Sequence, residues 1–222
     1  MHKIIGIEKL TDDKYLNYYK ITYLTPEGAK RSWSIASRNN IDNLVCKTGK
    51  VEANCVCIIP RVIVDGEPAL VITKEYRVPV GGYVYSFPAG IIDPGESPLD
   101  SALRELHEEI GVTKIKSARV LTGACLNSEG LTDESTITIE VNVDEFGKQN
   151  LQDDEDIQYE IVKLSELEEY LKGKNLSVRL GMYAPMAIRE YELYRENKAL
   201  RAENEKLKNK KGIKWYIVVI DH

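Results

Sequence analysis

Residues 90–112 decide the fold of this 222-residue chain, and they read GIIDPGESPLDSALRELHEEIGV. The stretch opens with a turn and then predicts a helix over 98–110. Ser97 is of a type that accepts a hydrogen bond from the first helical turn, and Pro98 suits the first helical position. Gly111 is a typical stop, because glycine readily takes the left-handed conformation that ends a helix. We therefore expect one short, well-bounded helix in the middle of the chain.

The predicted helix has an apolar face and an acidic face. Apolar residues recur at three- and four-residue spacing and form one stripe: Leu99, Leu103, Leu106 and Ile110. Glu105 and Glu109 lie four residues apart on another face, with Glu108 beside them. Arg104 is four residues before Glu108 and can bind it across one turn. The glutamates repel one another, and a divalent cation would offset that repulsion. Taken alone, however, an acidic helix face is more often simply solvated.

The complete pattern favours the metal site. It runs Gly90, five residues, Glu96, seven residues, and then Arg104-Glu105-Leu106-x-Glu108-Glu109-x-Gly111-Val112. This arrangement resembles the Nudix box at every defining position. The resemblance implies a Nudix hydrolase with an α+β Nudix fold, in which a mixed β-sheet lies between helices as a helix–sheet–helix sandwich.

The resemblance also implies ligands for Mg²⁺, with Mn²⁺ as a substitute: the backbone carbonyl of Ala89 and the carboxylates of Glu105, Glu108 and Glu109. It implies that Glu96 and Arg104 orient these carboxylates and that Gly90 supports them. A diphosphate is too negative to attract a water nucleophile until metal ions neutralise it. The reaction that the resemblance implies is therefore metal-dependent hydrolysis of a diphosphate.

Three further segments resemble ADP-ribose pyrophosphatases, also called ADP-sugar diphosphatases. They are 30–38 (KRSWSIASR), 74–90 (KEYRVPVGGYVYSFPAG) and 125–134 (CLNSEGLTDE), and with them the resemblance covers about residues 14–190. It implies hydrolysis of ADP-ribose or a related ADP-sugar to AMP and a sugar phosphate. Two alternatives stay open: a Nudix hydrolase of another nucleoside diphosphate derivative, such as a dinucleotide cofactor or a different nucleotide sugar, and a non-catalytic Nudix domain that senses a nucleotide. The intact box argues against the sensor.

In that subfamily an N-terminal strand region is exchanged between two subunits, and its aromatic residues stack on adenine. Trp33 and Tyr15 match these aromatic positions. Arg38 and Arg77 match positions that contact the diphosphate or the nucleotide, and Leu126 is a further substrate contact. Arginine suits phosphate, because its planar fork binds oxygens in pairs. Without this context Trp33 would be an aromatic that packs on a sheet, and each arginine a surface residue.

The subfamily commonly takes its general base from a glutamate in a loop well after the box. The acidic loop 153–156 lies in the matching place, and Glu155 aligns best. Asp156 and Glu160 are the alternatives. An acidic loop without this context is usually a solvated turn.

Hydrophobic patterning extends the prediction to the whole chain. Strands are predicted over 4–9, 16–24, 30–37, 55–64, 69–76, 84–87, 115–123, 135–143 and 159–163, with further helices over 165–172 and 175–209. Turn residues at 25–28 and 65–66 predict hairpins, and 79–82 reads as a loop. The predicted divisions are an antiparallel N-terminal β subdomain for dimerisation (1–50), the Nudix domain (51–190), and an extension with a helix and a terminal strand over 213–220 (191–222).

Three leucines of the extension, Leu193, Leu200 and Leu207, recur every seven residues. They could form a short coiled coil. Since only about three heptads are available, we favour a single long helix that packs on its own domain and then projects into solvent.

The composition limits the classes of partner. A net charge of −5, from 30 basic and 35 acidic residues, gives no general basic field for nucleic acid. No apolar run approaches the roughly 20 residues that span a bilayer, and the start MHKIIGIEKL lacks signal-peptide architecture. The four cysteines fit neither a disulfide scaffold nor a zinc site. We therefore expect a cytoplasmic homodimer that acts on a small nucleotide-sugar, without nucleic-acid or membrane partners.

Overall fold

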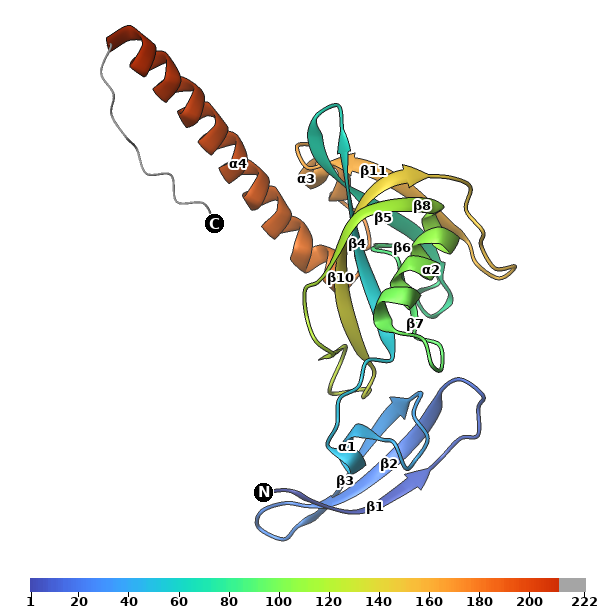
Figure 1. Ribbon diagram of the computed structural model, residues 1–222. Helices are drawn as coiled ribbons and strands as arrows, with labels where there is room; N and C mark the ends of the chain where they lie inside the picture. Colours follow the sequence, from blue (N-terminus) through green and yellow to red (C-terminus); the bar gives the residue numbers. More distant parts are fainter. Residues whose placement is uncertain (212–222) are drawn as a thin grey trace.

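The computed structural model describes the backbone of residues 1–211 and the side chains of residues 1–207. Figure 1 shows a small N-terminal sheet, a larger sheet with helices on both faces, and one long helix that projects away from it. Within the described chain, no helix combines the length and the apolar composition needed to cross a bilayer. The terminal strand predicted over 213–220 lies outside the described residues.

The N-terminal sheet is antiparallel, as predicted, with the order β1 (Lys3–Lys9), β2 (Asn17–Leu24) and β3 (Lys30–Ser37). The predicted turn joins β2 to β3, and Gly28 N donates to Thr25 O at 2.9 Å. The sheet and the chain that follows it enclose a small core of Tyr19, Ile21, Ile35 and Leu44. A single-turn helix α1 (Val45–Thr48), which the sequence did not predict, follows the sheet.

Asp133 fastens this sheet to the rest of the chain. Its buried carboxylate accepts a hydrogen bond from Ser37 Oγ at 2.5 Å and another from Val45 N at 3.1 Å. Beside it, Ala36 N donates to Leu131 O at 2.9 Å. The end of β3 is therefore fixed to the segment 130–134.

The larger sheet is mixed. Its strands are β4 (Cys55–Val64), β5 (Glu67–Arg77), β6 (Gly82–Ser86), β7 (Ala89–Ile91), β8 (Val112–Val120), β9 (Cys125–Leu126), β10 (Ser135–Phe146) and β11 (Ile157–Lys163). The central path runs β11-β5-β4-β10-β8, while β6 pairs with β5, β7 with β4 and β9 with β10. Only β4 and β10 pair in parallel among the described strand pairs.

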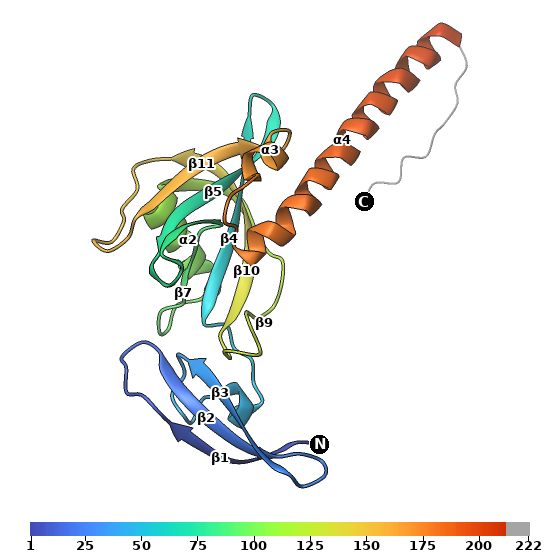
Figure 2. The ribbon, with the colours of Figure 1, turned by 180° about the vertical axis from the view of Figure 1, so that it is seen from behind.

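Strand β4 separates two hydrophobic layers, because successive side chains of a strand point to opposite faces. Val56 and Ile58 pack in the cluster that includes helix α2 (Pro98–Ile110). Cys57 and Ile59 pack on the other face, with residues of α3 (Leu167–Leu171) and α4 (Val178–Lys211). Figures 1 and 2 show α2 on one side of the sheet and α3 and α4 on the other. The predicted helix–sheet–helix sandwich is confirmed.

Helix α2 has the predicted ends. Ser97 Oγ accepts from Asp100 N at 3.2 Å, and Gly111 ends the helix with φ 70°. The predicted apolar stripe is partly wrong, because Leu99 is exposed and Leu103 is only half-buried. Ala102 packs beside Leu106 and Ile110 in their place.

Other differences lie at element ends and in short elements. The loop predicted over 79–82 contains a short 3₁₀ turn (Val78–Val80), and β6 begins two residues before the prediction. The strand predicted over 115–123 begins and ends three residues earlier, as β8, and β10 extends three residues further than predicted. Strands β7 and β9 are too short for a hydrophobic pattern to predict.

Candidate active site

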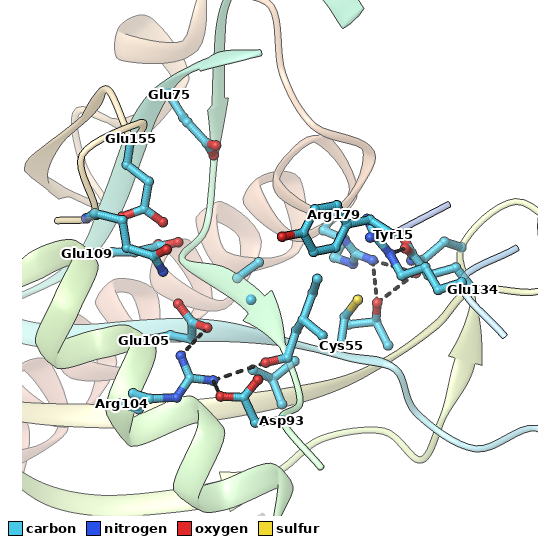
Figure 3. A pocket seen from close by; sticks show the side chains of 18 of the residues that line it. Tyr15, Cys55, Glu75, Asp93, Arg104, Glu105, Glu109, Glu134, Glu155 and Arg179 are labelled. Carbon is cyan, nitrogen blue, oxygen red and sulfur yellow. Dashed lines mark hydrogen bonds and ion pairs between the residues drawn. The ribbon is translucent and has the colours of Figure 1, made fainter. Parts of the chain in front are cut away.

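A cavity of about 540 Å³ lies at the edge of the larger sheet, beside α2 (Figure 3). Nine of the predicted site residues line it: Tyr15, Arg38, Arg77, Ala89, Gly90, Arg104, Glu105, Glu109 and Glu155. Four others, Trp33, Glu96, Glu108 and Leu126, do not line it. The structure therefore brings together residues from the loop between β1 and β2, the end of β3, β5, β7, α2 and the loop before β11.

Arg104 connects the carboxylates of the box. Its Nη1 contacts Glu105 Oε1 at 2.7 Å and Glu108 Oε2 at 3.2 Å. Its Nε and Nη2 donate to the two oxygens of Glu96, both at 3.1 Å, and Nη2 also donates to Ile91 O at 3.0 Å. The predicted Arg104–Glu108 contact is therefore present, as one arm of a larger network.

Glu96 is held as an anion by this network. Hydrogen bonds from Arg104 and from Ser101 Oγ lower the pKa of Glu96 to about 2. Although Glu96 lies outside the cavity wall, it fixes the orientation of Arg104 and, through it, of Glu105.

Glu105 and Glu109 are almost fully buried, with 7% and 5% of their surfaces exposed. Burial raises the pKa of both carboxyls, and that of Glu109 rises well above its usual value. The negative charges of Glu105, Glu75 and Glu155 raise it further, while the backbone N–H of Ala89 partly opposes them. For Glu105, Arg104 opposes the effect of burial. Among residues 1–207, Glu109 has no ion pair with a basic side chain.

Gly90 leaves the space that Glu105 occupies. A Cβ at position 90 would lie 2.0 Å from Glu105 Cδ, so no larger residue fits without moving that side chain. The first glycine of the box is therefore explained by the direct packing of β7 against α2.

The oxygen ligands available beside α2, carboxylates and backbone carbonyls, are those that a hard divalent cation prefers. Figure 3 shows Glu75, Glu105, Glu109 and Glu155 at one end of the cavity. As placed in the described chain, no three acidic, histidine or cysteine side chains stand close enough together to hold an ion. Arg104 meanwhile pairs with Glu105 and Glu108. The chemistry of the donors fits, and ion binding requires their side chains to move together.

The other end of the cavity is rich in arginine. Arg38 pairs there with Glu134 at 2.7 Å, whereas Arg77 lies at the carboxylate end, where it pairs with Glu75 at 2.7 Å. Tyr15 lies at the Arg179 end in Figure 3 and is 63% exposed.

Arg179, from the first turn of α4, differs from the other arginines of the cavity. It donates to Thr136 Oγ1 at 2.7 Å and to Asn127 Oδ1, both neutral acceptors. Within residues 1–207 it has no carboxylate partner. Its charge therefore remains available to an anion in the cavity.

Trp33 and Leu126 stand apart from the cavity in a single chain. Trp33 Nε1 donates to Gly130 O at 3.0 Å, and the side chain is 52% exposed. Leu126 belongs to the two-residue strand β9, which pairs with β10.

The sequence prediction missed seven charged, amide or hydroxyl residues of the cavity: Glu75, Asp93, Asn127, Glu134, Thr136, Gln152 and Arg179. Glu75 had a usable signal, because it lies two residues before Arg77 on a strand and so points to the same face. Arg179 had none, since it reaches the cavity only through the packing of α4.

The comparisons with known proteins agree with this geometry. A family model described as the NUDIX domain matches residues 56–180. An uncharacterized Nudix hydrolase of Schizosaccharomyces pombe is 32% identical over 197 residues, which cover 82% of this chain and 91% of that protein. The ADP-sugar pyrophosphatase of Mus musculus is 33% identical over 151 residues, covering 66% of this chain and 64% of that enzyme.

Two further relatives bear on the family and the fold. The ADP-ribose pyrophosphatase of Saccharomyces cerevisiae is 31% identical over 141 residues, covering 62% of this chain and 57% of that enzyme. The crystal structure of an ADP compounds hydrolase superposes with a TM-score of 0.64 and 18% identity, over 86% of this chain and 93% of that one. At that identity the superposition shows the fold alone.

Proposed function

The chain belongs to the Nudix hydrolase family, and we propose that it cleaves the diphosphate of ADP-ribose, or of a related ADP-sugar, into AMP and a sugar phosphate. One observation carries the proposal: a single cavity of about 540 Å³ has the buried carboxylates of Glu105 and Glu109 at one end and, at the other, Arg179 and the Arg38–Glu134 pair (Figure 3). This volume is within the range of sites for small organic ligands. The named activities of the mouse and yeast relatives support the same substrate class.

Nudix hydrolases use divalent metal ions, and we propose Mg²⁺ here, with Mn²⁺ as a substitute. Glu105, Glu108, Glu109 and the carbonyl of Ala89 would hold it. When bound, the ion neutralises the diphosphate and lowers the pKa of its water. Binding favours the ionised form of Glu109, whereas burial alone raises the pKa of this carboxyl.

Arg104 has a positioning role in this proposal. It already holds Glu96 and Glu105, and its guanidinium has five donors in a fixed fork. When Glu105 and Glu108 turn toward an ion, Glu96 keeps Arg104 in place beside them. The positive charge of Arg104 then lowers the repulsion among the remaining carboxylates.

Glu155 is the general base in this proposal. It lines the cavity, and its negative charge acts on both Glu105 and Glu109. The alternatives are engaged elsewhere: Asp156 accepts from the Tyr83 hydroxyl at 2.6 Å, and Glu160 interacts with Tyr170. Glu155 Oε2 accepts from Gln152 N at 2.9 Å, but within residues 1–207 Glu155 has no ion pair to give up when it takes a proton from an attacking water.

The arginines and the aromatic residues would position the nucleotide. We assign the diphosphate to Arg77 and Arg179 and the nucleotide end to Arg38, with Leu126 as a further contact near it. Tyr15 would stack on the adenine. Since Trp33 lies off the cavity of its own chain, we assign it to the cavity of a second subunit in a homodimer. A full exchange of residues 1–50 would carry Tyr15 and Arg38 to that cavity as well. The divisions 51–190 and 191–222 and a cytoplasmic location also remain predictions.

A substrate panel tests the function. ADP-ribose, GDP-mannose and NADH, each with Mg²⁺, are expected to show fastest cleavage for ADP-ribose, with AMP among the products. The Glu109→Gln variant controls for contaminating hydrolases. If GDP-mannose or NADH were cleaved faster than ADP-ribose, the assignment to ADP-sugars would be wrong and the faster substrate would define the class. Tight ADP-ribose binding without metal-dependent turnover would instead make the protein a sensor.

A further inference from the structure

Helix α4 carries a second apolar surface that the Nudix domain does not cover. Its first half packs on the sheet through Leu180, Ala184 and Ala187, all fully or almost fully buried. Met182 is two residues from both Leu180 and Ala184, and two residues turn a helix by about 200°. Met182 therefore points away from the domain, and it is 69% exposed.

An apolar stripe continues from Met182 along the projecting half of the helix. Met186 follows four residues later, and Leu193, Leu200 and Leu207 then follow at seven-residue intervals. These four side chains are 43% to 68% exposed. Figures 1 and 2 both show this half of α4 extending away from the sheets. Exposing such an apolar stripe to water is unfavourable in free energy, and packing the stripe against another helix removes that apolar surface from water.

The residues beside the leucines have the arrangement of a two-stranded coiled coil. With the leucines at position d of each heptad, Asn197 and Asn204 occupy position a. One heptad earlier position a is Glu190, which pairs with Arg61 of its own domain at 3.4 Å, so the pattern begins at Leu193. Leucine at d is typical of parallel dimers, and an asparagine at a fixes register and oligomeric state at some cost in stability. The leucines at d supply the apolar contact, and the asparagines at a favour one partner helix in one register.

The charges decide the direction of the partner helix. Glu196 and Glu203 occupy position g, and Arg201 occupies position e. In a parallel pair, g of one helix faces e of the next heptad on the other, so Glu196 faces the Arg201 of a second copy. In an antiparallel pair, g faces g, and glutamates would face glutamates.

We propose that residues 193–207 of α4 form a parallel, in-register two-stranded coiled coil with a second copy of this chain. The segment is short for an independent coiled coil, since an isolated helix must pay the cost of nucleation. Here the first half of α4, which packs on the sheet, already nucleates the helix. The projecting half therefore extends an existing helix and needs no nucleation of its own. This surface is distinct from the N-terminal sheet.

Cysteine cross-linking in the full-length protein tests the proposal. The exposed thiols of Cys46 and Cys125 are first replaced by serine. Leu193→Cys and Leu207→Cys are then introduced separately, with Lys198→Cys, at position b, as the matched control. Under mild oxidation each d-position variant is expected to form its same-position disulfide at least about tenfold faster than the control, because the pairing raises the effective concentration.

A charge reversal tests the proposed pairing of Glu196 with Arg201 of the second copy. Glu196→Lys in the Leu207→Cys background is expected to slow cross-linking, and adding Arg201→Glu restores it. Cross-linking no faster than the Lys198→Cys control would overturn the proposal. So would a disulfide formed only when Leu193→Cys and Leu207→Cys protein are mixed, since that pair meets in an antiparallel coil.

Discussion

Gly90 and Glu105 are complementary in shape: a Cβ added at Gly90 would stand 1.8 Å from Glu105 Oε1. The two residues lie on different elements, β7 and α2, and their contact forms one wall of the cavity. A larger residue at position 90 would therefore displace the side chain of Glu105, although Gly90 itself carries no acidic group.

Gly90→Ala is expected to displace Glu105 and to reduce turnover sharply, with a stability loss of about 1–3 kcal/mol from the added methyl group. Turnover at saturating Mg²⁺ and urea unfolding measure the two effects. Gly82→Ala is the matched control, because a Cβ there meets nothing within 4 Å. Equal loss in both variants would contradict the Gly90–Glu105 relationship.

The metal-free protein is expected to become less stable as the pH rises above about 4.5, the ordinary pKa of Glu109. Because burial raises the folded-state pKa of Glu109, the folded chain keeps a proton that the unfolded chain releases, so rising pH favours unfolding. For one proton the slope approaches about 1.4 kcal/mol per pH unit. Urea unfolding in EDTA between pH 5 and 8 measures it.

Glu109→Gln is the control for that slope. The variant should be less sensitive to pH, more stable than the parent in EDTA at high pH, and inactive. If the free energy of unfolding had the same pH dependence in parent and variant, the folded state would not raise the pKa of Glu109, and the prediction would be wrong.

Arg179→Gln is expected to raise KM for ADP-ribose about 10- to 100-fold, with a smaller effect on kcat, since a charge-assisted hydrogen bond contributes about 1.5–3 kcal/mol. The variant retains a donor for Thr136 and Asn127, so the loss reports the charge. Arg189→Gln, on the exposed part of α4, is the matched control. An unchanged KM would exclude Arg179 from substrate binding.

Glu155→Gln is expected to lower kcat about 10²- to 10⁴-fold, the usual contribution of a general base. Asp156→Asn, in the same loop, should have a small effect, because Asp156 faces Tyr83. Steady-state kinetics at saturating Mg²⁺ compare the two. Near-normal turnover of Glu155→Gln would remove the base role.

The sequence predicted local structure well where the determinants are local. Helix α2 begins at Pro98 and ends at Ile110 as expected, because a cap, a proline and a glycine set its ends within a few residues. The apolar stripe of α2 was less well predicted, because the spacing of apolar residues indicates which face of a helix is buried but not how wide that face is. Glu105 and Glu109 lie on the buried side of α2, close to Leu106.

The far wall of the cavity could not be predicted from periodicity. Asn127, Glu134, Thr136 and Arg179 come from the segment around β9, from β10 and from α4, and meet only through tertiary packing. The resemblance supplied Arg38 but not the Glu134 that holds it. The geometry therefore adds a partner for Arg38 and an additional cation, Arg179.

The anchoring of the N-terminal sheet has a practical consequence for protein engineering. Asp133 binds both Ser37 and Val45, and its neighbour Glu134 holds Arg38 at the cavity. A chimera that grafts residues 1–50 from a relative would separate these partners and leave a buried carboxylate uncompensated. The transferable module is the N-terminal sheet together with residues 127–134, two pieces of chain that are distant in sequence and must be exchanged together.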